Sequence, residues 1–360
     1  MINAENIKRI VIVHTAFIGD IILATPLFEA VHQSCPNATI DFLCTPAAAN
    51  IVETNPYINR IITYDKHDKQ KGLFQLLKLV FQLRKENYDI AFVPHRSFRS
   101  AMLIWLTRIP LRIGFNTSEG RMLFTHLVNY QKNSHEVERN FAFLTVLNSP
   151  IHYTTPVILP NTDDAELVTK WLSEQPFSQE NTCIAIAPGS VWQTKRWPPE
   201  KFIRVIEMLH NLRPTLQFIL IGGEKDEALC DFIQERVEFP LVNAAALFTL
   251  RQSAELLKKC TLLLTNDSAP THLGVAVKIP VITLFGPTIP EFGFAPYGKG
   301  NQIVEIPDLY CRPCGIHGGK ICPEKHFRCM MDIEPELVVQ KILSYEDIQN
   351  QPAESGTSIN

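Results

Sequence analysis

The sequence predicts an α/β protein with two doubly wound domains, each built on a parallel sheet. Its 360 residues are long for one compact core, so two domains are expected. Short β-branched apolar runs alternate with stretches of helical spacing, and this alternation restarts after residue 160. Such alternation is typical of parallel sheets covered by helices on both faces. We therefore predict domains at residues 1–160 and 161–333, facing each other across a ligand-binding cleft.

Four runs in the first domain have the length and composition of buried strands. They are residues 9–14, 39–44, 60–64 and 89–94. Helical spacing marks residues 22–33, 46–53 and 73–85. One face of the last of these helices holds Leu73, Leu76, Leu77, Val80, Phe81 and Arg84. The pattern weakens from residue 112 to residue 160, and the proline-containing stretch 150–164 is the expected linker.

The second domain repeats the alternation and then ends in a helix and a tail. Its expected strands are residues 183–187, 217–221, 241–242, 262–265 and 281–285. Its expected helices are residues 200–211, 225–235, 250–259 and 271–277, followed by a final helix within 334–348. The polar tail, 349–360, is expected to be disordered.

Composition and charge favour a soluble globular enzyme. The net charge is −3 and 46% of the residues are hydrophobic, so no broad nucleic-acid-binding surface is expected. The first apolar run, Ile10 to Val13, is too short for a signal peptide, and no apolar run approaches the roughly 18 residues of a membrane span. We predict a cytoplasmic protein and leave peripheral contact with the inner membrane open.

The first motif joins a strand to a helix through Gly19 and Asp20. Glycine permits close backbone approach, and a helix start offers free N–H groups and a positive dipole end. Aspartate at this place is equally common as a plain helix cap. From this segment alone, the cap and the catalytic interpretations both stay open.

The second motif follows the strand at 183–187 and contains Ser190, Thr194, Lys195 and Arg196. Two hydroxyls beside two cations are what a phosphate-binding loop needs. A solvated pair of cations is the alternative, but cations near a helix start are disfavoured unless an anion joins them. The motif therefore favours an anion site.

The third motif takes the strand at 262–265 into a helix start through Asp267, Ser268 and Ala269, with His272 one turn further on. The free N–H groups of such a helix start can receive a diphosphate without a metal ion. A lone histidine is more often structural, but the position of His272 beside this helix start raises the odds that it binds the same anion.

A fourth, weaker motif is Gly222 with Glu224 after the strand at 217–221. The glycine lets a ligand lie against the backbone, and the acid offers a partner for ribose hydroxyls. The sequence contains no Asp-x-Asp triplet, the usual metal-holding pair of metal-dependent sugar transferases. Stabilisation of the leaving diphosphate by Lys195 and helix dipoles is therefore expected instead, with no cofactor required for catalysis.

Together these segments resemble the family 9 glycosyltransferases, the heptosyltransferases of lipopolysaccharide core assembly, and most closely the type that adds the second heptose. The resemblance rests on Gly19-Asp20 with Ala24-Thr25-Pro26, on Lys195-Arg196-Trp197-Pro198, on Asp267-Ser268-Ala269 through His272, and on Phe285-Gly286-Pro287-Thr288. It implies the GT-B architecture of two Rossmann-like domains, with the acceptor on the first and the nucleotide sugar on the second. It also implies that the last helix packs back on the first domain.

Carried over residue by residue, the resemblance makes Asp20 the general base of an inverting transfer of heptose from ADP-heptose to the lipopolysaccharide core. Lys195 looks like the partner of the diphosphate. Asp267, Ser268, Ala269 and His272 look like the turn that binds the nucleotide sugar. Arg96, Arg99 and Arg112 resemble basic positions of the family that meet acceptor phosphates.

Four cysteines in the segment 311–329 resemble a cysteine-rich stretch of the second-heptose transferases. Cys311, Cys314, Cys322 and Cys329 have the spacing C-x2-C-x7-C-x6-C. A cytosolic location disfavours disulfides, and four thiols suit zinc or iron. The spacing lacks a second Cys-x-x-Cys, so a structural metal and a plain cysteine-rich loop stay equally open.

Two rival interpretations remain, and a third is set aside. A family 9 enzyme with another nucleotide sugar, or with a protein acceptor, would share these motifs. A nucleotide-sugar-binding protein without turnover would not need Asp20 beside Lys195. A nicotinamide oxidoreductase is set aside, because no Gly-x-Gly-x-x-Gly turn follows the first strand.

Overall fold

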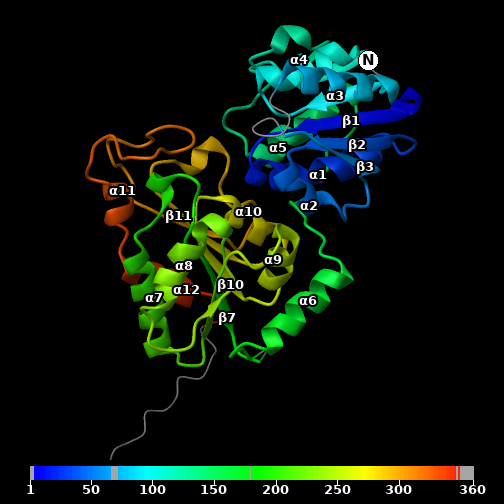
Figure 1. Cartoon of the computed structure of the whole chain (residues 1–360). Coiled ribbons are helices and arrows are strands. Elements are labelled where there is room, and N and C mark those ends of the chain that lie inside the picture. The colour runs from blue at the N-terminus through cyan, green and yellow to red at the C-terminus, as the bar shows by residue number, and fades with distance from the viewer. Residues whose placement is uncertain (1–3, 66–71, 179, 346–347, 349–360) are drawn as a thin grey trace, which may run out of the picture. The chain divides into compact units, whose positions relative to one another are not determined.

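The computed structural model describes residues 4–65, 72–178, 180–345 and 348. The chain divides into two compact units, Met1–Leu159 and Pro160–Asn360, coloured blue to green and green to red in Figure 1. This division lies one residue before the boundary expected from the sequence. The expected disordered tail, 349–360, lies outside the described residues.

The described part of the first unit contains a six-stranded parallel sheet with the order β3-β2-β1-β4-β5-β6. The strands are β1 (Arg9–His14), β2 (Thr39–Cys44), β3 (Arg60–Thr63), β4 (Ile90–Val93), β5 (Leu111–Phe115) and β6 (His126–Val128). The central strand β1 pairs with β2 on one side and with β4 on the other. Its residues Ile10 to Val13 have no exposed surface, as expected for a strand covered on both faces.

Helices follow the strands and cover the sheet. They are α1 (Ile18–Ser34), α2 (Pro46–Val52), α3 (Leu73–Lys85), α4 (Phe98–Thr107) and α5 (Glu136–Phe141). Helix α1 carries Pro26 in its interior, where the missing N–H would leave the carbonyl of Ile22 without its helical donor. The hydroxyl of Thr25 donates to that carbonyl at 2.7 Å. The same hydroxyl accepts a hydrogen bond from the amide of Val157 at 2.9 Å. Thr25 therefore also fixes the last segment of the first unit to α1.

Two features of the first unit differ from the sequence-based expectation. The stretch after residue 112, where the pattern weakened, forms β6 and α5, and β5 begins just before it. In α3 the residues Leu77 and Phe81, expected on one face with Leu76 and Val80, are 38% and 58% exposed. The face that packs into the core instead holds Leu76, Leu79, Val80 and Leu83.

The described part of the second unit repeats the same sheet, with the order β12-β11-β10-β7-β8-β9. Its strands are β7 (Cys183–Ala187), β8 (Gln217–Leu220), β9 (Val242–Asn243), β10 (Leu262–Asn266), β11 (Val281–Phe285) and β12 (Gln302–Glu305). Its helices are α6 (Thr162–Ser173), α7 (Pro199–Leu212), α8 (Glu227–Gln234), α9 (Leu250–Leu257), α10 (Ala269–Ala276), α11 (Arg328–Met331) and α12 (Pro335–Leu343). Counted from the first strand of each unit, both orders are the Rossmann order 3-2-1-4-5-6.

The last helix, α12, belongs to the core of the second unit. Its buried residues Val338, Val339 and Ile342 join the cluster that contains the apolar face of α7. The ammonium of Lys201 on α7 donates to the carbonyl of Ile333, just before α12, at 2.7 Å. The apolar face that the resemblance assigned to the first domain is therefore buried within the second.

Helix α10 packs closely on the sheet, because Gly274 has no side chain. A Cβ atom at this position would lie 2.7 Å from a methyl carbon of Val281 and 2.9 Å from one of Leu263. We expect Gly274→Val to lower the free energy of unfolding by about 1–3 kcal/mol through overpacking, measured by denaturant titration. Gly223→Val is the matched control, because a Cβ there meets nothing within 4 Å. Equal stability of the two variants would contradict this account of the packing.

Candidate functional site

Each sheet reverses its strand order once, between β1 and β4 in the first unit and between β7 and β10 in the second. Open parallel sheets bind ligands outside the carboxyl ends of the strands at such a point. The candidate residues follow these four strands: Gly19 and Asp20 follow β1, Arg96 and Arg99 follow β4, Ser190 to Arg196 follow β7, and Asp267 to His272 follow β10. The structure thus brings the motifs to the expected edge in each unit.

In the first unit, Asp20 lies in the first turn of α1 and is half-buried. Its Oδ2 accepts a hydrogen bond from the amide of Phe17 at 3.1 Å, so the helix-cap interpretation is correct. A carboxylate has two oxygens, and the Phe17 amide bonds to Oδ2. Capping therefore holds the carboxylate in place and does not exclude a second role as a base.

Charged side chains gather around Tyr130, just after β6. The guanidinium of Arg96 lies over its ring at 4.2 Å and that of Arg139 at 4.6 Å. Arg139 forms a buried ion pair with Glu136 at 2.9 Å. Burial raises the pKa of Tyr130, and the negative charges of Glu136 and, to a smaller extent, Asp20 raise it further. Asp20 therefore shares its surroundings with two arginines, one of which the sequence analysis missed.

Beside this cluster, three polar side chains form a small network at the ends of β1 and β4. The Nδ1 atom of His95 lies 3.1 Å from the hydroxyls of both Thr15 and Ser100, and those hydroxyls are 3.3 Å apart. No motif marked these residues in the sequence. Their position after two neighbouring strands was the only available signal.

Of the other two arginines predicted to meet acceptor phosphates, Arg99 lies at the same edge of the sheet as Arg96, and Arg112 lies at the opposite edge. Arg99 donates from Nε to the hydroxyl of Tyr64 at 2.8 Å. Arg112 lies near the amino end of β5 and donates to the carbonyls of Ile109 and Leu123 at 2.6 and 3.0 Å. Arg112 is therefore at the opposite edge of the sheet from Arg96, and the structure does not bring the three arginines together.

In the second unit, the loop after β7 and the end of β10 are joined by a buried ion pair. The Nζ atom of Lys195 lies 2.5 Å from Oδ2 of Asp267, and the two residues are 9% and 6% exposed. The hydroxyl of Thr288, after β11, donates to the same oxygen at 2.6 Å. Three motifs that were separate in the sequence therefore meet at one carboxylate.

Asn266, the last residue of β10, fixes the backbone of the loop after β7. Its side-chain Nδ2 donates to the backbone carbonyl of Pro188 at 2.8 Å. Its side-chain Oδ1 accepts from the backbone amide of Trp197 at 3.1 Å. Trp197 is buried in the core of the unit. The loop that carries Lys195 is thus held at both ends by one buried asparagine.

Arg196 and Ser190 also serve this loop. Arg196 donates from Nε to the carbonyl of Ser190 at 2.7 Å and forms an ion pair with Asp226 at 3.4 Å. Asp226 lies against Gly189 and Gly222, where an added Cβ would come within 2.2 and 2.8 Å of it. Both positions must therefore be glycine to leave room for the Asp226 side chain. The sequence motif had pointed instead to the neighbouring Glu224, which is exposed.

The start of α10 follows Asp267 directly, with Ser268 as the N-cap residue and Ala269 as the first helical residue. The Ser268 hydroxyl does not cap the helix. It donates to the carbonyls of Gly189 and Asn266, at 3.4 and 3.3 Å. His272 is buried within the first turn. The helix start and its positive dipole end therefore lie beside the Lys195–Asp267 pair.

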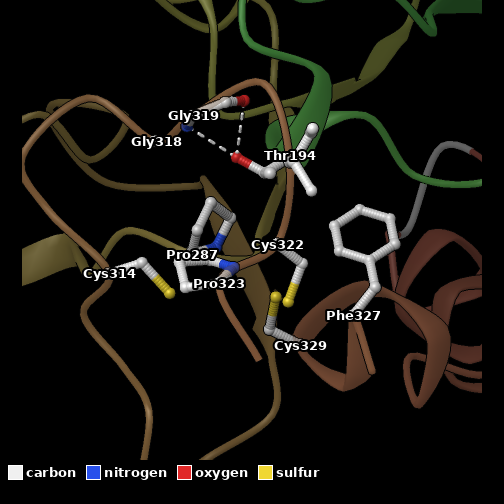
Figure 2. A pocket seen from close by; sticks show the side chains of 10 residues that line it. Thr194, Pro287, Cys314, Gly318, Gly319, Cys322, Pro323, Phe327 and Cys329 are labelled. Atoms are coloured by element: carbon white, nitrogen blue, oxygen red, sulfur yellow. Dashed lines mark hydrogen bonds between the residues drawn. The ribbon is translucent and has the colours of Figure 1, made fainter. Parts of the chain in front are cut away.

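The cysteine-rich segment packs against the same loop. The hydroxyl of Thr194 accepts a hydrogen bond from the amide of Gly319 at 2.7 Å and donates one to the carbonyl of Gly319 at 3.0 Å. A pocket of about 50 Å³ lies between the segment and the loop. Figure 2 shows Cys314, Cys322 and Cys329 around this pocket, with Thr194 above them. Thr194, predicted to bind substrate, therefore anchors the cysteine-rich segment in this structure.

The four thiols share one environment. Burial raises the pKa of Cys329 to about 12, and the nearness of Cys314, Cys322 and Cys311 contributes to this rise. The sulfur of Cys311 also lies 3.8 Å from Nε2 of His326. Within the described ranges, however, no group of three or more His, Cys, Asp or Glu side chains is arranged to hold a metal ion.

The hydrogen bonds of Thr194 allow a direct test of how firmly the segment is held. Thr194→Val keeps the shape of the side chain but leaves the amide of Gly319 without its acceptor, which costs about 1–3 kcal/mol. We expect faster alkylation of Cys314 and Cys322 by iodoacetamide, read by mass spectrometry. Thr63→Val, on the exposed end of β3, is the control. Unchanged alkylation rates in Thr194→Val would show that this anchor is unimportant.

Comparisons with known proteins agree with this geometry. The model of glycosyltransferase family 9 (heptosyltransferase) matches residues 76–324. Lipooligosaccharide heptosyltransferase 2 of Haemophilus influenzae is 25% identical over 93% of this chain and 98% of its own length. Lipopolysaccharide heptosyltransferase 3 of Escherichia coli is 29% identical over 75% of this chain and 80% of its own.

A solved structure shows the same fold. The ADP-heptose lipopolysaccharide heptosyltransferase II of Escherichia coli superposes with a TM-score of 0.76 at 22% identity, covering 93% of this chain and 97% of the other. Each unit here has the Rossmann strand order, and the fold is that of the GT-B glycosyltransferases. Because the family model matches more than half of the sequence, the chain belongs to glycosyltransferase family 9, the heptosyltransferases.

Proposed function

We propose that this enzyme transfers heptose from ADP-heptose to the inner core of lipopolysaccharide, with inversion at the anomeric carbon. The observation that carries the proposal is the Lys195–Asp267–Thr288 cluster at the start of α10. It supplies a buried cation and a helix dipole where a sugar diphosphate is expected to bind. The names of its relatives supply the sugar and the acceptor.

On the donor side, Lys195 is proposed to neutralise the leaving diphosphate. Direct displacement at the anomeric carbon places negative charge on the departing nucleotide diphosphate, and a fixed cation in a buried site stabilises it. A diphosphate is a stable leaving group, so this stabilisation replaces a general acid. Ser190, Arg196, Gly222 and Glu224 lie on neighbouring loops and are proposed to contact the nucleotide sugar.

On the acceptor side, Asp20 is proposed to take the proton from the attacking hydroxyl. Inversion requires a base on the face of the sugar opposite the leaving group. Arg96 and Arg139, which both stack on Tyr130, add positive charge beside Asp20. We propose that they attract the phosphates of a lipopolysaccharide core.

We further propose that the enzyme works in the cytoplasm, in peripheral contact with the inner membrane that anchors its acceptor. In the part of the chain that the structure describes, no helix is both long and apolar enough to cross a bilayer. Catalysis is proposed to need no metal, and a zinc or iron ion at the four cysteines is proposed only as a structural element.

The role of Asp20 can be tested without removing its cap. In Asp20→Asn the amide oxygen still accepts from the Phe17 amide, but the side chain no longer accepts a proton. We expect kcat to fall by about 10²–10⁴-fold, with unchanged affinity for the nucleotide sugar by calorimetry. Asp163→Asn, on the exposed first turn of α6, is the control. A kcat near the wild-type value would exclude Asp20 as the base.

A pair of variants separates the structural role of Lys195 from its catalytic role. Lys195→Met leaves the buried carboxylate of Asp267 without its cation, which costs about 3–5 kcal/mol of stability. Lys195→Met/Asp267→Asn removes that charge, and we expect it to regain most of the stability but no transfer activity. Recovery of both stability and activity in the double variant would mean that the ion pair serves the fold alone.

The proposed reaction is tested by mass spectrometry of truncated core lipopolysaccharides incubated with ADP-heptose, and with UDP- and GDP-sugars in parallel. A gain of one heptose on a particular truncation, maintained in chelator, is the expected result. Transfer only from another donor would overturn the sugar assignment. Loss of turnover in chelator by a protein that stays folded would contradict the metal-free mechanism.

A further inference from the structure

Helix α3 carries apolar residues on two opposite faces. Leu76, Leu79, Val80 and Leu83 are buried in the core of the first unit. The opposite face holds three large apolar side chains, which are Phe74, Leu77 and Phe81, exposed by 78%, 38% and 58%. Because residues three, four and seven apart lie on one side of a helix, these three side chains form a continuous outer stripe.

The same outer face is strongly cationic. Lys78, Arg84 and Lys85 lie within one turn of the stripe residues and on the same side of the helix. The segments 72–85 and 90–118 contain no aspartate or glutamate. Cations and aromatic rings therefore alternate on this face of α3, and neither segment supplies an acid to it.

The two acids that follow α3 are used elsewhere. Glu86 forms ion pairs with Arg9 and Arg60 at 2.7 and 2.9 Å. Asp89 accepts from the backbone amides of Lys8 and Arg9 at 2.7 and 2.9 Å. Both carboxylates are thus bound to elements at the amino ends of β1 and β3, and they do not neutralise the cations of α3.

Helix α4 lies beside α3 (Figure 1) and extends this face. A pocket of about 330 Å³ is lined by Arg84, Trp105, Leu106, Arg108 and Arg112. Trp105 is 49% exposed. Arg84 joins the two helices, since its guanidinium donates to the carbonyl of Leu106 at 2.7 Å and lies 5.6 Å from the centre of the Phe81 ring.

We define the α3–α4 surface as the exposed apolar residues Phe74, Leu77, Phe81 and Trp105 with the cations Lys78, Arg84, Lys85, Arg108 and Arg112. We propose that the α3–α4 surface docks the enzyme on an anionic phospholipid bilayer. Its purpose rests on the proposed function, because a lipid-anchored acceptor must be met at a membrane. Aromatic side chains enter the headgroup region, while lysines and arginines meet lipid phosphates.

Charge favours a bilayer over a second copy of the chain as the occupant. A symmetric contact between two copies would place the same cationic patch against itself, and the like charges would repel each other. An anionic lipid surface offers the opposite sign. It also accepts the protruding rings of Phe74 and Phe81 without requiring a complementary pocket.

The experiment is flotation of the full-length enzyme with vesicles of phosphatidylcholine alone or mixed with phosphatidylglycerol. We expect the enzyme to bind the anionic vesicles, less at high salt, and to leave phosphatidylcholine vesicles unbound. Lys78→Glu/Lys85→Glu should weaken binding at least about tenfold. Phe74→Ser/Phe81→Ser should weaken it as well, since it removes the inserting rings. Leu167→Ser/Lys170→Glu, which makes one apolar-to-serine change and one charge reversal on exposed residues of α6, should bind like the wild type.

The proposal is overturned if the wild type ignores anionic vesicles, binds neutral ones equally well, or loses nothing in the α3–α4 variants. Sedimentation velocity separates the remaining alternative: a dimer that these variants dissociate, without vesicle binding, would make this face a self-association surface. Transfer to a delipidated core acceptor should be unchanged in the variants, while transfer to an acceptor embedded in vesicles should fall. If the wild type transfers heptose to neither acceptor, the proposed function is refuted. The flotation experiment then still decides whether the α3–α4 surface binds membranes.

Discussion

The buried ion pair of Lys195 and Asp267 connects the loops on which the candidate site of the second unit depends. Placing two charges away from water is costly, and such a pair persists only where further hydrogen bonds complete it. Thr288 provides one of these bonds, and Asn266 locks the loop that carries the lysine. The cysteine-rich segment holds the same loop from the other side through Thr194. The loops that follow β7, β10 and β11 are therefore linked to one another, and each depends on the others for its conformation.

This arrangement suits an anionic ligand. Without a ligand, the lysine charge is balanced by Asp267, so the cation does not remain buried and unpaired. A diphosphate at the start of α10 would meet the Lys195 ammonium and the positive end of the helix dipole, both already in place. Groups fixed in advance need little rearrangement when charge develops on a leaving group.

The two units use the same topological position for different chemistry. In each of them the polar residues follow the two strands at which the strand order reverses. The first unit gathers Asp20 with the arginines around Tyr130, which suits an acceptor with phosphates and a hydroxyl to be deprotonated. The second gathers one buried cation and a helix start, which suits a nucleotide diphosphate.

Sequence patterns predicted the central strands well, because β1, β7, β10 and β11 are continuous apolar runs. The edge strands β6 and β12 were missed, since both are short and partly exposed. Strand β5 was missed as well, because an arginine and a glycine interrupt its apolar run. In α3 the helical spacing grouped the buried Leu76 and Val80 with the exposed Leu77 and Phe81, because periodicity reports spacing and not which side of a helix is covered.

The candidate site was predictable as separate motifs but not as a set of contacts. Lys195 and Asp267 each stood out beside a strand end, yet they are 72 residues apart in the sequence and nothing local pairs them. Tyr130 and Arg139 follow a strand that the pattern did not reveal, so no signal placed them near Asp20. Asp226 was overlooked in favour of Glu224, because the contact that needs Gly189 and Gly222 is tertiary.

The central claim is that Lys195 is the cation of the donor diphosphate. A crystal structure of the enzyme with ADP tests it most directly. We predict that the Lys195 ammonium lies within hydrogen-bonding distance of a diphosphate oxygen, with the diphosphate at the start of α10. ADP bound with its diphosphate elsewhere, and Lys195 still paired only with Asp267, would contradict the account.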